Sequence, residues 1–331
     1  MPKTLERGDI YFFYRPKVDV EDVESLDQTQ RFHIVMVPDD TKKGRLFVVG
    51  KKRLPEMTKG KAKSTSREWM MNYTTATPGK IGSALGPVVY RTKTKGERTQ
   101  PEAIPAAEGR YALYERDGST RLGYRVTNPK QRGKALDELG ILQEASYVIA
   151  VRNPEVKVRG FPDRKPKYPK TLQKQFADER WIDVGDPKLL DYENAQLVLI
   201  GAHEGFDKED PKITGRPNLF KKLGLERREW RTESIEKGEF AAPSAEAKPV
   251  APKRDRTKGG KRGGRVATRA PSAAGLARAL KGVHFPRSRR SLVSHAKNNE
   301  ADKEVVGVLR ELPNRQYKNM ADVQKAFSEV R

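Results

Sequence analysis

The side chains that could do chemistry in this sequence are chiefly lysines and arginines gathered in one stretch. Residues 251–300 hold 14 Lys and Arg against 2 Asp and Glu, and so supply +12 of a formal net charge of +23. Guanidinium and ammonium groups pair with phosphate oxygens, and glycines between them leave a chain free to follow a groove. The run KRDRTKGGKRGGR, residues 253–265, therefore predicts contact with a polyanion through its phosphates and without reading of bases.

Two sets of basic side chains are expected to make these contacts. The first set lies in the basic stretch and just beyond it: Lys253, Arg254, Arg256, Lys258, Lys261, Arg262, Arg265, Arg269, Arg287, Arg289 and Arg290. The second set is Lys51, Lys52 and Arg53. It opens residues 51–100, where 12 basic side chains outnumber 3 acidic ones, whereas residues 1–50 have a net charge of −1. This uneven distribution favours a binding footprint over a surface whose charge only keeps the protein soluble.

Catalytic and metal-binding patterns do not accompany these cations. The chain contains no cysteine, which excludes a thiolate zinc site and a thiol nucleophile, and its four histidines form no ligand pair such as HxxxH. Asp9, Glu68, His33 and His203 are available as acids or bases, but none belongs to a triad, a phosphate-binding loop or a metal motif. We therefore interpret them as structural or surface groups, and we expect no catalytic residue, no metal and no cofactor.

An antiparallel sheet is the element expected to carry the first part of the chain. Apolar runs rich in β-branched and aromatic residues predict strands that begin at Asp9, Arg31, Arg45, Tyr111, Arg121, Ser146 and Ala195. Asp117-Gly118 between two of these runs is a strong hairpin signal, and Gly140 is expected to end a short helix. Residues 1–205 are therefore predicted to form a mainly antiparallel β domain of the α+β class.

Several large apolar side chains follow the basic residues near position 51. Trp69, Met70, Met71 and Tyr73 could form a platform on which bases stack, but large apolar side chains are usually buried. We therefore interpret them as part of the core, packed against the sheet.

Two further segments join this domain to the end of the chain. Residues 206–240 are densely charged with both signs, and we interpret them as a solvated transition segment with short helices near 217–223 and 227–235. Residues 241–274 contain no aromatic side chain and almost no branched aliphatic one, so they cannot bury enough apolar area to offset their chain entropy. They are predicted to be a disordered basic linker.

Residues 275–331 are predicted to be a small helical module. One helix carries apolar residues at i, i+3, i+4 and i+7, which places them on one face: Val305, Val308, Leu309 and Leu312. Ser288 is expected to cap one helix, and Asn319, with Asp322 three residues later, is expected to cap another. Helices this short need one another's apolar faces, so we expect a small bundle.

Three segments of this module resemble a known family. They read ALKGVHFP (279–286), SLVSHAKNNEADKEV (291–305) and LPNRQYKNMADVQKAF (312–327). In this order they resemble a small bacterial domain family known only as domain of unknown function 2795. The resemblance implies a bacterial protein and a compact helical fold, and it implies no catalytic residue. Because residues 301–331 are nearly neutral, we assign the module to docking or to a protein partner, and we expect phosphate contact there only from Arg287, Arg289 and Arg290.

The start of the chain resembles a second family. Residues 7–11 read R-G-D-I-Y, which is similar to the opening strand of the toxin endoribonucleases of toxin–antitoxin pairs, and RFHIVMV with Arg31 could stand for their next strand. These toxins are small barrels, although here no Ser or Thr follows RFHIVMV as it does in that family. The resemblance implies RNA cleavage, so an endoribonuclease-like N-terminal domain is one alternative.

Together these patterns indicate a non-enzymatic nucleic-acid-binding protein whose basic linker contacts phosphates largely independently of sequence. They do not choose between DNA and RNA. A scaffold for protein partners, with the basic linker as a plain spacer, is the other alternative. No run of about twenty apolar residues is present, so no membrane segment is expected. We expect a soluble cytoplasmic protein and keep association with the nucleoid open.

Overall fold

The computed structural model describes residues 2–241, except 19, 21–22, 59–63, 93–95 and 209, and part of residues 276–330. In that second range residues 277–278, 284, 300 and 302 are not described. The chain divides into two compact units, Met1–Lys253 and Arg254–Arg331, which we describe separately. The linker expected over residues 241–274 lies outside the described residues, apart from Ala241.

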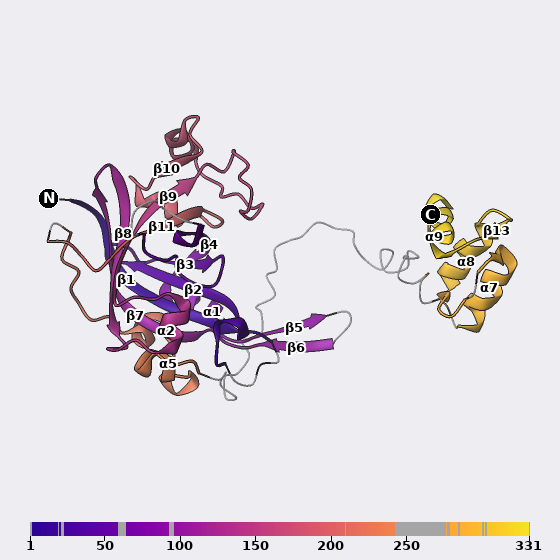
Figure 1. Ribbon diagram of the computed structural model, residues 1–331, viewed down its shortest axis with the longest axis horizontal. Coiled ribbons are helices and arrows are strands. Elements are labelled where there is room, and N and C mark those ends of the chain that lie inside the picture. The colour runs from indigo at the N-terminus through magenta and orange to yellow at the C-terminus, as the bar shows by residue number, and fades with distance from the viewer. Residues whose placement is uncertain are drawn as a thin grey trace. The chain divides into compact units, whose positions relative to one another are not determined.

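The first unit is an antiparallel β-barrel (Figure 1). Its ring consists of β1 (Lys3–Pro16), β2 (Thr29–Pro38), β3 (Gly44–Val49), β4 (Arg67–Ala76), β7 (Ile104–Arg116), β8 (Ser119–Asn128), β9 (Glu144–Arg152) and β11 (Gln196–Glu204). The strands follow the order β9-β11-β4-β3-β2-β1-β7-β8, and pairing of β8 with β9 closes the ring. Closure removes the free edges that an open sheet would expose.

Three more strands attach to this ring or stand apart from it. β10 (Trp181–Asp183) pairs with β9, and β5 (Val88–Thr92) and β6 (Gly96–Gln100) form a separate hairpin. The seven strands expected from the sequence are confirmed as β1, β2, β3, β7, β8, β9 and β11. The α+β class and the mainly antiparallel first unit are confirmed with them.

Both faces of the barrel wall are buried, which explains the nearly continuous apolar runs in β1 and β2. Ile10, Phe12 and Tyr14 point into the barrel, whereas Tyr11 and Phe13 between them belong to a second cluster on the outside. Helices α1 (Pro78–Leu85), α4 (Leu219–Leu223) and α5 (Glu233–Lys237) contribute to that outer cluster. A strand covered on both sides shows no polar–apolar alternation.

Residues 206–240 differ from the solvated arm expected from the sequence. Leu219, Leu223 and Ile235 are buried against the outer face of the barrel. The apolar residues of this segment are few, but their helical spacing lets α4 and α5 turn them to one side. The short helix expected near 217–223 is confirmed as α4.

The remaining helices of this unit are short. They are α2 (Lys134–Leu139), α3 (Lys170–Gln173) and the 3₁₀ turns Leu26–Gln28, Ser64–Ser66, Lys174–Phe176, Pro187–Asp191 and Arg227–Glu229. Gly140 ends α2 with a φ of 71°, as its sequence predicts. The hairpin expected at Asp117-Gly118 is confirmed as the β7–β8 turn, where both residues have positive φ.

The second unit is a small group of helices, as expected. It contains α7 (Arg289–Asn298), α8 (Lys303–Glu311), α9 (Met320–Val330) and the paired short strands β12 (Arg287–Ser288) and β13 (Gln316–Tyr317). Leu292 of α7, Leu309 of α8 and Val323 of α9 are fully buried in one core. Both predicted caps are confirmed, because Ser288 accepts from the backbone of Ser291 and the Asn319 side chain accepts from the backbone of Asp322. Among the described residues, no helix is long and apolar enough to span a bilayer.

Candidate functional site

Eight of the basic residues expected to contact phosphate lie outside the described residues. They are Lys253, Arg254, Arg256, Lys258, Lys261, Arg262, Arg265 and Arg269. Their role as phosphate contacts stays a prediction from the sequence.

The expected basic residues of the first unit lie in the turn that follows β3. Lys51 is exposed, and its ammonium nitrogen lies 3.8 Å from Oε2 of the buried Glu68 carboxylate. Lys52 has a positive φ of 66°, and its Nζ donates a 2.7 Å hydrogen bond to the carbonyl of Thr29. Arg53 is half-buried. Lys51 is thus exposed but faces the Glu68 carboxylate, whereas Lys52 secures the turn, and the role of Lys51 as a phosphate contact stays a prediction.

The expected arginines of the second unit have different surroundings. Nη1 of Arg289 donates to the carbonyl oxygens of Arg310 at 3.2 Å and Leu312 at 3.0 Å, at the end of α8. It therefore satisfies carbonyls that a helix end leaves without partners, and its charge suits the negative end of the helix dipole. Arg287 and Arg290 lie at the surface.

A pocket of about 320 Å³ on the outer face of the barrel brings together residues from distant segments. Strands β1 to β4 supply most of its lining, and α1, β5, β6 and the segment at 162–164 supply the rest. Its polar lining consists of Arg15, Arg31, His33, Tyr73, Gln100 and Arg164. No carboxylate lines it among the described residues, so its charge is positive. A concave, positively charged lining of this kind suits an anionic ligand.

His33 lies in the wall of this pocket and is almost completely buried. Its neighbours Phe32 and Ile34 point into the barrel, so His33 faces outward and is 5 % exposed. Burial, followed by the charges of Arg15 and Arg31, lowers the pKa of His33 to about 3. The backbone of Phe47 lies near enough to favour the charged ring slightly, yet neither ring nitrogen has a hydrogen-bond partner of normal geometry among the described residues. The ring is therefore neutral and keeps one donor and one acceptor unused.

Arg15 and Arg31 stand opposite each other across the β1–β2 pairing. The guanidinium group of Arg15 donates to the carbonyls of Ala84 (3.1 Å), Leu85 (3.1 Å), Gly86 (3.0 Å) and Pro101. It therefore caps the end of α1, and burial lowers its pKa to about 10, so it stays charged at neutral pH. Arg31 is exposed and has no carboxylate within ion-pair distance among the described residues.

Gln196 of β11 positions the opposite side of the pocket. Its Nε2 donates to the carbonyls of Pro162 at 2.9 Å and Arg164 at 2.7 Å. Gln196 is buried, so these bonds hold the segment at 162–164 against the barrel. The exposed side chain of Arg164 is thereby brought to the pocket.

Tyr73 is the extra residue of a β-bulge. Asn72 pairs with Phe47 and Thr74 pairs with Leu46, which leaves Tyr73 without a partner in the β3–β4 ladder. Strand alternation puts Tyr73 on the same outer face of β4 as Trp69 and Met71, and Tyr73 is 53 % exposed at the pocket. The interpretation of Tyr73 as core is therefore wrong, although Met70 and Met71 of the same strand are buried as expected.

A second pocket, of about 540 Å³, shares Trp69 with the first. Phe161 lies 6.3 Å from the Trp69 ring and 5.1 Å from the Trp181 ring, measured between centroids. Burial raises the pKa of Glu68 in this pocket, while the backbone N–H of Trp69 and the charge of Lys51 oppose that shift. A side chain at position 50 would collide with Glu68 and Trp69, so Gly50 is required for this close packing.

Other arginines of the barrel are already paired with carboxylates. Arg45 is 2 % exposed, binds both oxygens of Glu6 at 2.7 and 2.8 Å, and contacts Asp191 at 2.7 Å. Arg110 binds Asp9 at 2.6 Å, so Asp9 is a structural group, as interpreted from the sequence. These pairs hold the barrel together and offer no charge to a ligand.

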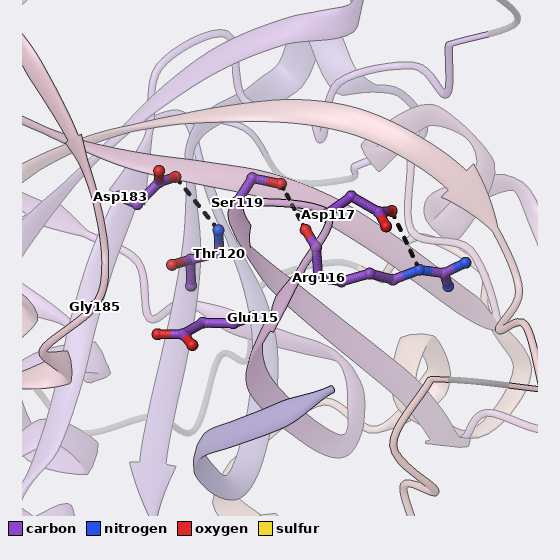
Figure 2. Close-up of a pocket in the computed structure, with 8 residues that line it drawn as sticks. Glu115, Arg116, Asp117, Ser119, Thr120, Asp183 and Gly185 are labelled. Carbon is purple, nitrogen blue, oxygen red and sulfur yellow. Dashed lines mark hydrogen bonds and ion pairs between the residues drawn. The ribbon is translucent and has the colours of Figure 1, made fainter. Parts of the chain in front are cut away.

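The β7–β8 turn forms a shallow pocket of a different character. Figure 2 shows the Asp183 carboxylate accepting from the backbone N–H of Thr120 at 3.3 Å, and Ser119 Oγ donating to the Arg116 carbonyl at 3.1 Å. Glu115 and Asp117 also line this pocket. Its three carboxylates would repel phosphate, which separates it from the basic pocket on the outer face.

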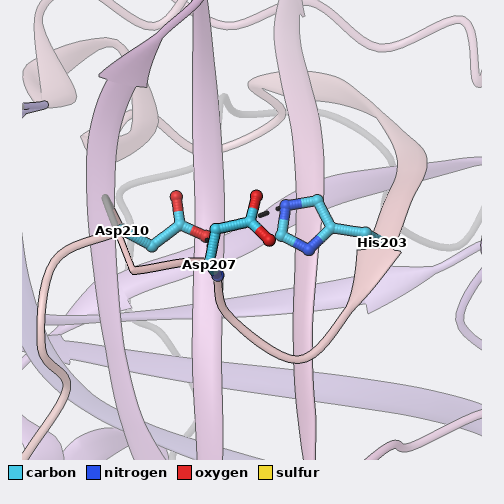
Figure 3. Close-up of side chains that lie close together, drawn as sticks. All are labelled: His203, Asp207 and Asp210. Carbon is cyan, nitrogen blue, oxygen red and sulfur yellow. Dashed lines mark hydrogen bonds and ion pairs between the residues drawn. The ribbon is translucent and has the colours of Figure 1, made fainter.

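His203, Asp207 and Asp210 are the three described residues closest to a metal-binding arrangement, with ligand atoms within 4.8 Å of one another (Figure 3). Arg116, however, lies 2.8 Å from Asp207 and 2.7 Å from Asp210. Arg116 also holds the pKa of Asp210 below its usual range, against the effect of burial. The carboxylates are thus engaged by a cation of the protein, and the cluster is an ion-pair network.

Sequence reasoning missed Arg31, Arg164 and Tyr73 as members of one site. Arg31 and Arg164 are 133 positions apart, and no local pattern shows that β2 and the segment after β9 meet. One sequence signal pointed to this site: the polar His33 lies inside the otherwise apolar run of β2. A buried imidazole normally has hydrogen-bond partners, so a histidine at such a position marks a polar site.

The protein consists of an antiparallel β-barrel with a basic pocket on its outer face, followed along the chain by a short helical module. Residues 271–324 match the family described as Protein of unknown function (DUF2795), which confirms the resemblance of the C-terminal module to that family. The N-terminal region has no assigned family. No curated protein and no solved structure matches the chain.

Proposed function

We propose that this protein binds nucleic acid by phosphate contacts that are largely independent of sequence. Two regions make these contacts: the basic segment at 251–270 and the basic pocket on the outer face of the barrel. The observation that supports the proposal most directly is the pair Arg31 and Arg164. Both guanidinium groups lie at one pocket, and neither has a carboxylate partner among the described residues.

The contrast with the other arginines of the barrel strengthens this proposal. Arg45 and Arg110 bind carboxylates, whereas Arg31 stands opposite a second cation, Arg15, in the β1–β2 register. Like charges directly opposite each other destabilise a sheet. A bound phosphate would offset that repulsion, so the pocket is better suited to holding an anion than to being empty.

A salt titration tests the proposal. Binding of DNA and RNA by the full chain should weaken steeply with salt, because each phosphate contact adds about 0.7–0.9 to the slope of log K against log salt. Deleting residues 251–270 should lower both affinity and slope. The double variant Arg31→Gln/Arg164→Gln should lower the slope by about 1–2. A flat salt response, or no loss on either change, would contradict the proposal.

Arg228→Gln provides a matched control. Arg228 is exposed and lies in the first unit, but it does not line the basic pocket. The control removes one charge, as each pocket substitution does, so it measures the effect of net charge alone. Equal losses for Arg31→Gln and Arg228→Gln would show that the pocket has no special role.

Endoribonuclease activity is a second candidate, because the first unit is a barrel that opens with the residues R-G-D-I-Y. Packing, however, accounts for these letters: a side chain at position 8 would collide with the Val37 carbonyl, and Asp9 binds Arg110. His33 is also a weak base, since its pKa is about 3. Incubation of labelled RNA with the full chain decides this point, because cleavage lost in His33→Leu would favour the endoribonuclease.

The scaffold alternative makes a separate prediction. If the basic segment is only a spacer, then a chain without residues 251–270 keeps its protein partner and the full chain shows no affinity for nucleic acid.

A further inference from the structure

We propose that the basic pocket on the outer face receives one unpaired base, so that the protein binds single-stranded nucleic acid in preference to duplex. This inference rests on the proposed function and specifies the form of its ligand.

The unused hydrogen-bonding groups of His33 are the first observation. A buried polar group without a partner costs about 1–3 kcal/mol, and native proteins rarely leave one in place. His33 lines the pocket, but both of its ring nitrogens are buried, so a ligand reaches them only once the imidazole turns toward the pocket. A phosphate alone would meet the acceptor nitrogen with repulsion, because phosphate oxygens accept hydrogen bonds. The edge of a base, which carries donors and acceptors side by side, matches a neutral imidazole.

The aromatic residues of the pocket are the second observation. The ring of Tyr73 lies on the outer face of β4, the same face as Trp69 and Met71, and it is 53 % exposed at the pocket that Trp69 also lines. An exposed aromatic ring beside arginines is the arrangement on which unpaired bases stack, and each stacked base contributes about 1–3 kcal/mol. A paired base inside a duplex has both faces covered by its neighbours and could not reach Tyr73.

The size and the rim of the pocket set the length of the ligand it can enclose. Its volume of about 320 Å³ lies at the lower end of the range of about 300–1,000 Å³ that is typical of small-ligand sites, so it suits one base rather than several. Arg31 and Arg164 lie at the same pocket and can bind the phosphates on either side of that base. The second pocket, which shares Trp69 with the first, offers Arg67 to the continuing strand, whereas its Lys51 faces the Glu68 carboxylate.

Fluorescence anisotropy with the full chain tests this inference. The probes are a labelled mixed-sequence oligonucleotide of about twelve nucleotides, as DNA and as RNA, and the same DNA annealed to its complement. At about 0.15 M salt, the single strands should bind at least tenfold more tightly than the duplex. Tyr73→Ala should weaken single-strand binding about fivefold or more and leave duplex binding unchanged. His33→Leu should weaken it about threefold to tenfold.

Tyr90→Ala is the matched control. Tyr90 is also an exposed tyrosine, at 37 %, but it does not line the pocket, so its removal should change single-strand affinity less than twofold. Equal binding of single strand and duplex, or equal losses for Tyr73→Ala and Tyr90→Ala, would overturn the inference and leave the proposed function standing. Absence of binding to every probe would instead refute the proposed function. Binding of a mononucleotide as tight as that of the oligonucleotide would identify a free nucleotide as the ligand and overturn the strand preference.

Discussion

Replacing His33 with leucine should remove a pH-dependent contribution to the stability of the barrel. In the folded protein, burial and then the charges of Arg15 and Arg31 lower the pKa of His33 to about 3, against an ordinary value of 6.5. The unfolded chain therefore gains a proton near pH 6.5 that the folded barrel does not take up. Stability decreases as the pH falls below 6.5, by about 1.4 kcal/mol per pH unit, which gives about 2 kcal/mol between pH 7 and pH 5.

Urea unfolding followed by tryptophan fluorescence measures this difference. All three tryptophans, Trp69, Trp181 and Trp230, lie in the first unit, so the signal reports on the barrel. From pH 7 to pH 5, the wild-type free energy of unfolding should fall by about 2 kcal/mol more than that of His33→Leu. Carboxylates titrate equally in both proteins and cancel in the comparison.

His295→Leu is the control for this experiment, because His295 lies in the second unit and should leave the barrel transition at its wild-type pH dependence. Parallel curves for the wild type and His33→Leu would show that the folded barrel accepts the proton. The argument that burial and neighbouring cations keep this imidazole neutral would then be refuted.

Two further substitutions test what positions the pocket and what holds the barrel. Gln196→Leu should release the segment that carries Arg164, because it removes two hydrogen bonds of 2.9 and 2.7 Å. We expect faster tryptic cleavage after Arg164 in this variant. Unchanged cleavage would contradict the role of Gln196 as an anchor. Arg45→Met should cost about 3–5 kcal/mol in urea unfolding, because it removes the cation from the largely buried Glu6 carboxylate and leaves it the Tyr111 hydroxyl as a partner. Adding Glu6→Leu should restore most of that loss, and a loss below about 1 kcal/mol would contradict the argument.

Seven of the eight strands of the ring could be predicted individually from their composition, but the closure of the barrel could not. Runs such as IYFFY and HIVMV identify β1 and β2 without ambiguity. Closure depends on the pairing of β8 with β9, in which Arg121 faces Val148 and Tyr124 faces Ala145. Strand β4 was missed because REWMMNYTTA mixes charged, polar and apolar residues, and its assignment needs β3 and β11 on either side.

The site was less accessible to sequence reasoning than the fold. Hydrophobicity places Tyr73 in the core, whereas it lies on the outer face of β4 with Trp69 and Met71 and is 53 % exposed. The basic character of the region was recognised through Lys51, yet the pocket depends on Arg31 and Arg164, which have unremarkable neighbours in the sequence. Charge counts locate a basic region, whereas tertiary packing decides which of its cations are paired with carboxylates and which can bind a ligand.

Arg15 shows how the architecture and the recognition chemistry depend on each other. The two terminal nitrogens of its guanidinium group donate to the carbonyls at the end of α1 and of Pro101, so these donors are not available to a phosphate. Its charge nevertheless lies beside His33 and opposite Arg31. Burial is the main cause of the lowered pKa of His33, and the charge of Arg15 lowers that pKa further and adds to the positive potential of the pocket. A residue that caps a helix therefore also contributes to the proton state of the group that would meet a base, and the site cannot be separated from the packing of α1 on the barrel.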